Sequence, residues 1–263
     1  MTGKAPRSGN AVAEDDVRAM FDDIAPVYDR LNTLMTFGGD GRWRRAAVLA
    51  TGLLPGDRGI DVACGTGKLT TAVAEAVGPF GQAVGIDLSP RMIDLARSAQ
   101  PSLVQLEFRV GNALALPFEA GSFDAATIGF GMRNLADFEA GFRELARVVR
   151  PGGRVVCVEL SMPRPLWWGR LFHGAFRRVA PVLGAVFGRR DAYRYLPTSL
   201  DGFPDANHLA GTMRAAGLAD VSYRRLGLGS VALHAGTVPG APSSVGGPRS
   251  AGGPGSARGV DSA

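Results

Sequence analysis

Apolar residues gather in short runs through the middle of the chain, and polar segments with helical spacing separate these runs. Between residues 57 and 160 the apolar runs are Gly59–Ala63, Gln82–Ile86, Leu106–Val110, Phe123–Ile128 and Arg154–Leu160. Each run has the length and composition of a buried strand. Because strands and helices alternate at this spacing, the pattern predicts an α/β fold with a doubly wound, mostly parallel sheet.

The intervening helices are predicted from their start and stop signals. Lys68–Val77 begins directly after a glycine turn. At Ser89-Pro90, a capping side chain precedes a residue that the first helical turn tolerates. The 137–149 segment places four apolar side chains on one face, and Pro151-Gly152-Gly153 is expected to end it.

The segment before the first predicted strand has a helical pattern. Residues 1–13 are small and polar, and we expect them to be disordered. Residues 14–53 repeat apolar positions at helical spacing, and Pro26 is expected to interrupt the helix. We expect 14–53 to form a helical lid on the folded domain.

After the alternating region the pattern changes again. A helix is predicted over 205–217, and a Gly-rich turn joins strands Val221–Leu226 and Ser230–Gly236 into an antiparallel hairpin. Residues 239–263 are almost all Gly, Pro, Ser and Ala, a composition that cannot bury apolar surface, so we expect a disordered tail. The sequence therefore predicts one folded domain over 14–238.

Composition narrows the functional classes. The chain has 263 residues, a net charge of +5 and two cysteines, Cys64 and Cys157. We expect both cysteines to be packed thiols in a reducing cytosol. The modest, dispersed charge argues against nucleic acid as a partner, and the histidines lack metal-ligand spacing. Because the chain has neither a signal core nor an apolar run of about 18 residues, we expect a cytoplasmic protein.

A glycine turn gives the first indication of chemistry. Ile60–Gly67 reads I-D-V-A-C-G-T-G, so Gly65 and Gly67 lie where the first predicted strand meets a helix. Twenty residues past Gly67, Asp87 ends the next predicted strand. Glycine backbone allows a ligand to approach the turn closely, and a carboxylate at the neighbouring strand end can accept hydrogen bonds from ribose hydroxyls. The pattern predicts a nucleoside-binding βαβ unit.

Two common nucleotide motifs do not fit this turn. The dinucleotide fingerprint needs a third glycine where Thr70 stands, and a P-loop needs Ser or Thr where Leu69 follows Lys68. A nicotinamide oxidoreductase is therefore the least favoured interpretation.

The order of polar residues at successive strand ends favours S-adenosylmethionine instead. An amide at the end of the third predicted strand can pair with an adenine edge, and a C-terminal hairpin after five α/β strands is typical of methyltransferases. The residues that form this pattern are Asp61, Gly65, Gly67, Asp87 and Asn112.

Four further segments resemble a known family, the quinone C-methyltransferases of menaquinone and ubiquinone biosynthesis. The resemblance covers about residues 15–238. Its segments are Tyr28–Asn32 continuing to Trp43, Phe130–Asn134, Arg147–Ser161 and Asp191–Leu196. Asp40 stands where the family usually has histidine, Gly129 where a serine is common, and Thr36 replaces a serine.

The resemblance implies an S-adenosylmethionine-dependent C-methyltransferase of class I fold that converts demethylmenaquinol to menaquinol. It assigns Thr66 and Gly67 to the methionine part of the cofactor, Asp87 to the ribose, and Asn112 and Ala113 to the adenine. No metal is expected to be needed.

The resemblance also implies residues for the acceptor side. Arg133 would stabilise a phenolate on the quinol ring, and Asn134 would orient a ring oxygen or a water. Tyr28, with Phe21, would form part of a lid that excludes water. Tyr193 and Tyr195 would border the quinol.

The isoprenoid substrate implies contact with a membrane, and we expect residues 163–204 to form an insertion that faces the substrate and the membrane. Residues 163–190 interleave aromatic and aliphatic side chains with arginines, and no acidic residue lies between Glu159 and Asp191. Such a segment is typical of an interfacial helix on an anionic surface. We expect transient contact at the inner face of the cell membrane, although a cap helix over the pocket or a homodimer face would give the same pattern.

Two other functions stay open at this point. Asp40 and Gly129 leave room for another aromatic or polyketide-like acceptor. A cofactor-binding subunit of a quinone-synthesis complex, without catalysis of its own, is also compatible with the motifs.

Overall fold

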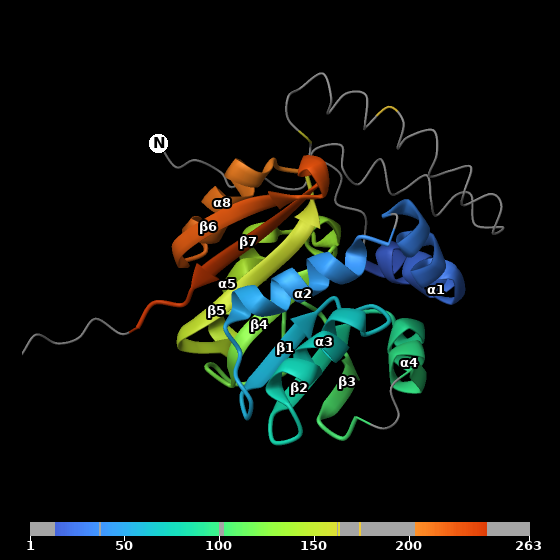
Figure 1. Cartoon of the computed structure of the whole chain (residues 1–263), viewed down its shortest axis with the longest axis horizontal. Helices are drawn as coiled ribbons and strands as arrows, with labels where there is room; N and C mark the ends of the chain where they lie inside the picture. The colour runs from blue at the N-terminus through green and yellow to red at the C-terminus, as the bar shows by residue number, and fades with distance from the viewer. Residues whose placement is uncertain are drawn as a thin grey trace, which may run out of the picture.

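A seven-stranded sheet in the order β3-β2-β1-β4-β5-β7-β6 forms the centre of the computed structural model (Figure 1). The structure describes residues 14–36, 38–99, 103–161, 163, 174 and 203–240. The predicted disordered segments 1–13 and 239–263 and the predicted insertion 163–204 lie wholly or mostly outside these residues.

Five strands run parallel, and the last two form the predicted antiparallel hairpin. β1 pairs with β2 and β4, β2 with β3, and β4 with β5, all in parallel, whereas β7 is antiparallel to both β5 and β6. The strands are β1 Arg58–Val62, β2 Gln82–Asp87, β3 Leu106–Val110, β4 Phe123–Gly129, β5 Val149–Leu160, β6 Ala219–Leu226 and β7 Val231–Thr237.

Helices cover both faces of the sheet (Figure 1). α2 and α3 pack on one face, where Ala47, Leu69 and Val156 share a buried cluster. α5 and α8 pack on the other, where Phe142 and Leu209 join the largest buried cluster. The helices are α1 Glu14–Met35, α2 Asp40–Thr51, α3 Lys68–Val77, α4 Pro90–Ala99, α5 Phe138–Val148 and α8 Ala206–Ala215, with 3-10 turns η1 Met132–Asn134 and η2 Gly227–Gly229.

Helix boundaries follow local capping. Ser89 Oγ accepts from the Met92 N–H at 3.0 Å, which caps α4 as the sequence predicts. Asp137 accepts from Ala140 N at the start of α5, and Asp205 accepts from Asn207 N and His208 N at the start of α8. The structure thus agrees closely with the predicted helices 137–149 and 205–217.

Pro26 departs from its prediction, because α1 continues through it without a break. Proline removes one hydrogen bond from a helix and crowds the preceding turn. Val17, Ile24 and Ala25, which precede Pro26 in the helix, are buried. We attribute the continuous helix to this packing, which outweighs the local penalty.

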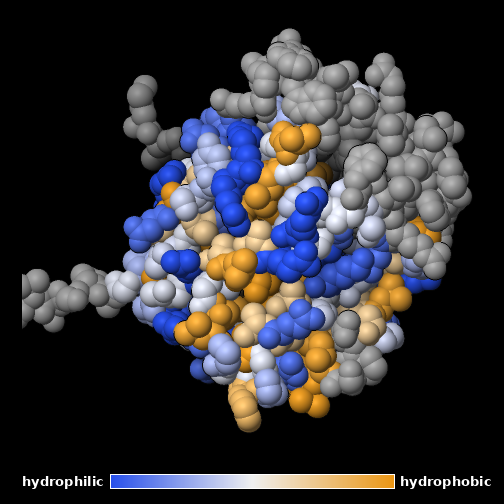
Figure 2. Space-filling model, viewed as in Figure 1, coloured by the Kyte–Doolittle hydropathy of each residue, from blue (hydrophilic) through white to orange (hydrophobic). Residues whose placement is uncertain are grey.

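Polar and apolar residues are interspersed on the face that carries α2 (Figure 2). Leu49, Leu54 and Phe80 are among the exposed large apolar side chains. Scattered apolar residues of this kind are ordinary on a folded domain. Within the described residues, none of the helices is both long and apolar enough to cross a membrane.

Candidate active site

The carboxyl ends of the parallel strands meet at one edge of the sheet, and a cleft opens there. It encloses about 730 Å³ of space, part of which is open solvent. The lining comprises Glu14, Val17, Phe21, Tyr28, Ala63, Gly65, Asp87, Leu88, Met92, Gly111–Leu114, Gly129–Gly131 and Asn134–Ala136.

The turn after β1 brings backbone to the cleft in a left-handed conformation. Ala63, Gly65 and Gly67 have φ values of +53°, +55° and +79°. Glycine adopts such angles without strain, whereas a non-glycine residue such as Ala63 is uncommon there. The Gly65 N–H donates to Asp87 Oδ2 at 2.8 Å, so this turn is tied directly to the end of β2.

Two backbone N–H groups hold the Asp87 carboxylate in place. Its Oδ1 accepts from Ser89 N at 2.9 Å, and its Oδ2 accepts from Gly65 N. Burial raises its pKa, and the two N–H donors oppose that shift. A carboxylate offers roughly four lone-pair sites, so acceptor capacity remains for ribose hydroxyls.

Asp61 lies beneath the cleft and is buried in the core. Its carboxyl accepts from Thr70 Oγ1 of α3 at 2.7 Å and from Thr127 Oγ1 of β4 at 2.8 Å. Burial raises its pKa to about 6, although both hydroxyl donors favour the ionised form. Asp61 therefore joins β1, α3 and β4 behind the ligand turn.

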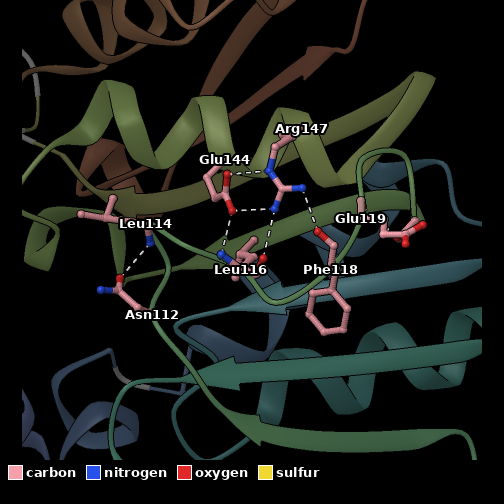
Figure 3. Close-up of polar contacts among 8 residues, drawn as sticks. Asn112, Leu114, Leu116, Phe118, Glu119, Glu144 and Arg147 are labelled. Atoms are coloured by element: carbon pink, nitrogen blue, oxygen red, sulfur yellow. Dashed lines mark hydrogen bonds and ion pairs between the residues drawn. The ribbon is translucent and has the colours of Figure 1, made fainter.

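Hydrogen bonds position both the Asn112 side chain and the loop that carries it. Its Oδ1 accepts from Leu114 N at 2.8 Å. From α5, Glu144 accepts from Leu116 N at 2.7 Å, and Arg147 donates to the Leu116 and Phe118 carbonyls (Figure 3). Glu144 and Arg147 are themselves paired, and the hydrogen bond from Arg147 lowers the pKa of Glu144. This network fixes the loop that carries Asn112 and Ala113.

α1 forms one wall of the cleft through both apolar and acidic side chains. Val17, Phe21 and Tyr28 face the cleft, and the rings of Phe21 and Tyr28 meet edge to face at 6.1 Å. Glu14 Oε2 accepts from Asn112 Nδ2 at 2.9 Å, which joins the start of α1 to the loop after β3.

Two more carboxylates of α1 reach the strand-end loops. Asp22 accepts from Ser89 Oγ, and Asp29 accepts from Thr66 Oγ1 at 2.8 Å and pairs with Lys68. The contacts place α1 against the glycine turn and the start of α4. That this helix opens and closes as a lid stays a prediction.

The turn after β4 contains the second strained residue of the cleft. Phe130 has φ +58°, and its ring lies 6.2 Å from that of Trp43. Arg133 Nη1 donates to the Phe130 carbonyl at 2.7 Å and to Glu159 Oε1 of β5. Arg133 and Glu159 are 8% and 0% exposed. Removing one partner of such a buried pair costs about 3–5 kcal/mol, because it leaves an unpaired charge.

Comparison with known proteins places this geometry in a family. The model of the ubiE/COQ5 methyltransferase family matches residues 10–238. The chain belongs to the ubiE/COQ5 methyltransferase family. It is 39% identical to a demethylmenaquinone methyltransferase of Lactococcus lactis, over 90% of this chain and 96% of that one. It is 45% identical to the Thermus thermophilus protein of the same name, over 84% and 100%.

A solved structure confirms the fold of this methyltransferase. A SAM-dependent methyltransferase of Thermotoga maritima superposes with a TM-score of 0.59 at 19% identity, covering 84% of this chain and 99% of that one. The predicted class I methyltransferase fold, with its antiparallel C-terminal hairpin, is therefore correct.

The structure brings many of the predicted site residues of the methyltransferase into one cleft and leaves others behind it. Tyr28, Gly65, Asp87, Asn112, Ala113 and Asn134 line the cleft. Asp61, Thr66, Gly67 and Arg133 are not among the lining residues, and their contacts support the turns instead. Tyr193 and Tyr195 lie outside the described residues.

Some lining residues were not predicted as site residues. Glu14 and Val17 share a helix face with Phe21 and Tyr28, so their spacing was a usable signal. Gly129, one of the departures from the family pattern, also lines the cleft, whereas Asp40 is buried and paired with Arg44.

Cys64 is a poor nucleophile in this setting. Burial, followed by the nearby Asp87 and Asp61 charges, raises the pKa of its thiol well above the usual value. Cys157 is buried in β5, and burial raises the pKa of its thiol in the same way. Both cysteines are free, as predicted, and the thiol form is favoured at neutral pH.

Asp61 predicts a pH dependence of stability. A pKa of about 6 lies above the roughly 3.9 of an unfolded aspartate, so the fold favours the protonated acid. The stability that the fold gains from the raised pKa of Asp61 amounts to about 3 kcal/mol. It is fully present below about pH 4 and is lost as the pH rises through 6. Urea unfolding at pH 4.5 and 7.5 should therefore show Asp61→Asn gaining stability relative to wild type at the higher pH. If the stability difference between Asp61→Asn and wild type were the same at both pH values, the raised pKa of Asp61 would be contradicted.

The turns after β1 and β4 pack so closely that a side chain added at Gly131 should clash with Ala63. A Cβ placed on Gly131 would lie 2.5 Å from Ala63 Cβ, which is closer than real side chains approach. Gly131→Ala should therefore lower the free energy of unfolding by about 1–3 kcal/mol. Ala63→Gly in the same chain should recover most of it, because glycine removes the methyl and tolerates the positive φ.

Gly211→Ala is the matched control, since a Cβ there meets no atom within 4 Å. It should be neutral or stabilising in the same urea titration, because alanine favours helix over glycine. A double variant as unstable as Gly131→Ala would show that the clash is not with Ala63.

Proposed function

We propose that this methyltransferase transfers the S-adenosylmethionine methyl group to a ring carbon of demethylmenaquinol, giving menaquinol. The observation that carries the proposal is a family match over 10–238 on a cleft that joins Gly65, Asp87 and Asn112 to Asn134. Relatives that match this chain over nearly their whole length bear the name of this activity.

The chemistry of the side chains that line the cleft suits the cofactor. Asp87 offers acceptor oxygens for ribose hydroxyls, and Asn112 an amide for the adenine edge. Apolar side chains on both sides of that position, including Leu88, Met92 and Ala113, suit a flat base. Gly65 leaves backbone accessible, and Thr66 lies next to it for the methionine part.

The bound cofactor supplies an electrophilic methyl group on sulfur, so the protein's task is alignment and exclusion of water. Phe21, Tyr28 and Phe130 give the cleft aromatic walls. Asn134 also lines the cleft, and its amide can hold a quinol hydroxyl. Transfer to carbon releases a ring proton, and a phenolate on the ring promotes the attack.

The direct test combines labelled S-adenosylmethionine with chemically reduced demethylmenaquinone. Wild type should place label in menaquinone, and Asn134→Ala should lower kcat about 10–100-fold while it still binds S-adenosylhomocysteine, because misalignment of the acceptor is costly. Glu75→Gln, at an exposed position on α3, should match wild type.

Label on a short, soluble aromatic acceptor but not on the quinol would replace this substrate with an aromatic or polyketide-like one. Cofactor binding without turnover on either acceptor would favour the non-catalytic subunit and contradict the proposal.

We further propose transient contact with an anionic membrane surface, from a cytoplasmic protein. Support comes from the sequence of 163–190, where arginines alternate with Trp167, Trp168 and other apolar residues. A long-chain quinol also requires access to lipid. The segment lies mostly outside the described residues, and a homodimer interface remains the alternative use for it.

Vesicle binding tests this contact. Arg177→Gln with Arg178→Gln should weaken binding to anionic vesicles roughly 30-fold at low salt, because each basic residue near such a surface contributes about 1 kcal/mol. The control pair Arg91→Gln with Arg224→Gln removes the same charge from exposed positions outside the segment. Equal losses in the two variants, or equal binding to neutral vesicles, would refute a specific contact.

A further inference from the structure

Arg133 lies in the turn that borders the cleft, and its guanidinium contacts Glu159 and the Phe130 carbonyl. Nη1 donates to Glu159 Oε1 and to the Phe130 carbonyl at 2.7 Å, and the residue is not among those lining the cleft. With the side chain 4% exposed, the guanidinium is held inside the fold beside β5.

Glu159 is the other half of this arrangement. It is the next-to-last residue of β5 and is fully buried. Besides the guanidinium, its carboxylate accepts from the Arg133 backbone N–H at 3.3 Å and from Leu160 N at 2.8 Å. Glu159 thus holds both the side chain and the main chain of Arg133, and Arg133 in turn holds Phe130.

The turn that this pair holds needs support. Phe130 adopts φ +58°, a conformation that costs a non-glycine residue free energy and that persists only where the surroundings impose it. Phe130 N–H donates to Val158 O at 2.8 Å, so β5 holds the residue from the other side. Phe130, Gly131 and Asn134 of the same turn line the cleft.

We propose that Glu159 is a positioning residue for methyl transfer. Through Arg133 it holds the Phe130–Asn134 turn in its strained form, so that the Phe130 ring and the Asn134 amide face the acceptor. Arg133 acts in the same way, by holding the turn, rather than as a cation against the phenolate. The kinetic part of this proposal rests on the proposed function, whereas the structural part does not.

The two roles for Arg133 predict different behaviour when Glu159 loses its charge. If the guanidinium stabilises a phenolate directly, Glu159→Gln removes a competing anion and leaves kcat intact or raised. If the pair positions the turn, Glu159→Gln and Arg133→Gln each lower kcat about 10–100-fold. The double variant then loses no more than either single variant, because both changes break one unit.

The pH profile of kcat separates the roles independently. Loss of a direct cation would move the ionisation that controls kcat to higher pH in Arg133→Gln. Loss of positioning lowers kcat at every pH and leaves the midpoint where it was. Affinity for S-adenosylhomocysteine should stay within about twofold in all variants, which also shows that they are folded.

Hydrogen exchange gives a readout that needs no quinol. In Glu159→Gln, amides of residues 130–134 should exchange faster, while those of 65–71 keep the wild-type rate. Glu75→Gln, which makes the same change on an exposed face, should alter neither segment.

Unchanged exchange at 130–134, wild-type kcat in Glu159→Gln, or a shifted midpoint in Arg133→Gln would each overturn the proposal. A wild-type protein without quinol turnover would refute the proposed function alone, and the exchange result would still decide whether Glu159 holds the turn.

Discussion

A carboxyl group buried below the cleft ties together the elements on which the rest of the site is built. Asp61 joins β1 to Thr70 of α3 and Thr127 of β4, the strand and helix that flank the glycine turn. The two hydroxyls satisfy the acid without neutralising it by a cation, which is why burial dominates its pKa. With β1 fixed in this way, Ala63 and Gly65 enter the cleft in left-handed conformations against the end of β2.

Two arginine–glutamate pairs then fix the loops on either side. Glu144 and Arg147 lie near the surface and hold the Asn112 loop through its backbone. Arg133 and Glu159 are buried and hold the Phe130 turn. A surface pair contributes little to stability by itself, whereas a buried pair must stay intact once formed. Both pairs set loop geometry at the cleft, one in the Asn112 loop and one in the Phe130 turn.

The sequence predicts the sheet well because each parallel strand is a short, buried apolar run bounded by polar or turn-forming residues. The strands β1 to β4 begin within a residue or two of their expected starts. The fifth parallel strand, β5, begins at Val149 rather than Arg154. Asp87 and Asn112 were found because a parallel sheet brings strand ends together whatever the side chains between them. The helix through Pro26 was missed because its tertiary packing has no signature in the local pattern.

Arg133 illustrates what a sequence motif leaves open. A motif identifies which residues lie near the chemistry, but it does not show which way a long side chain turns. The partner of Arg133 is 26 residues away at the end of another strand. Nothing in the spacing of Phe130–Asn134 indicates that the partner is the Glu159 carboxylate. Glu159 falls within the apolar run Arg154–Leu160, where the pattern predicts only a strand. The same applies to Glu14, whose contact with Asn112 spans 98 residues.

The place of β7 in the sheet has a consequence for synthesis of the chain. β7 lies between β5 and β6, so β6 has no neighbour until the last strand of the sheet is made. Until residue 237 has been synthesised, β5 presents an open edge with the apolar run Val155–Val158. Unpaired apolar edges promote association between chains, and pairing over long sequence separations is slow. A nascent chain of this protein is therefore most exposed to aggregation in the interval before its final strand is added, when most of its residues are already in place.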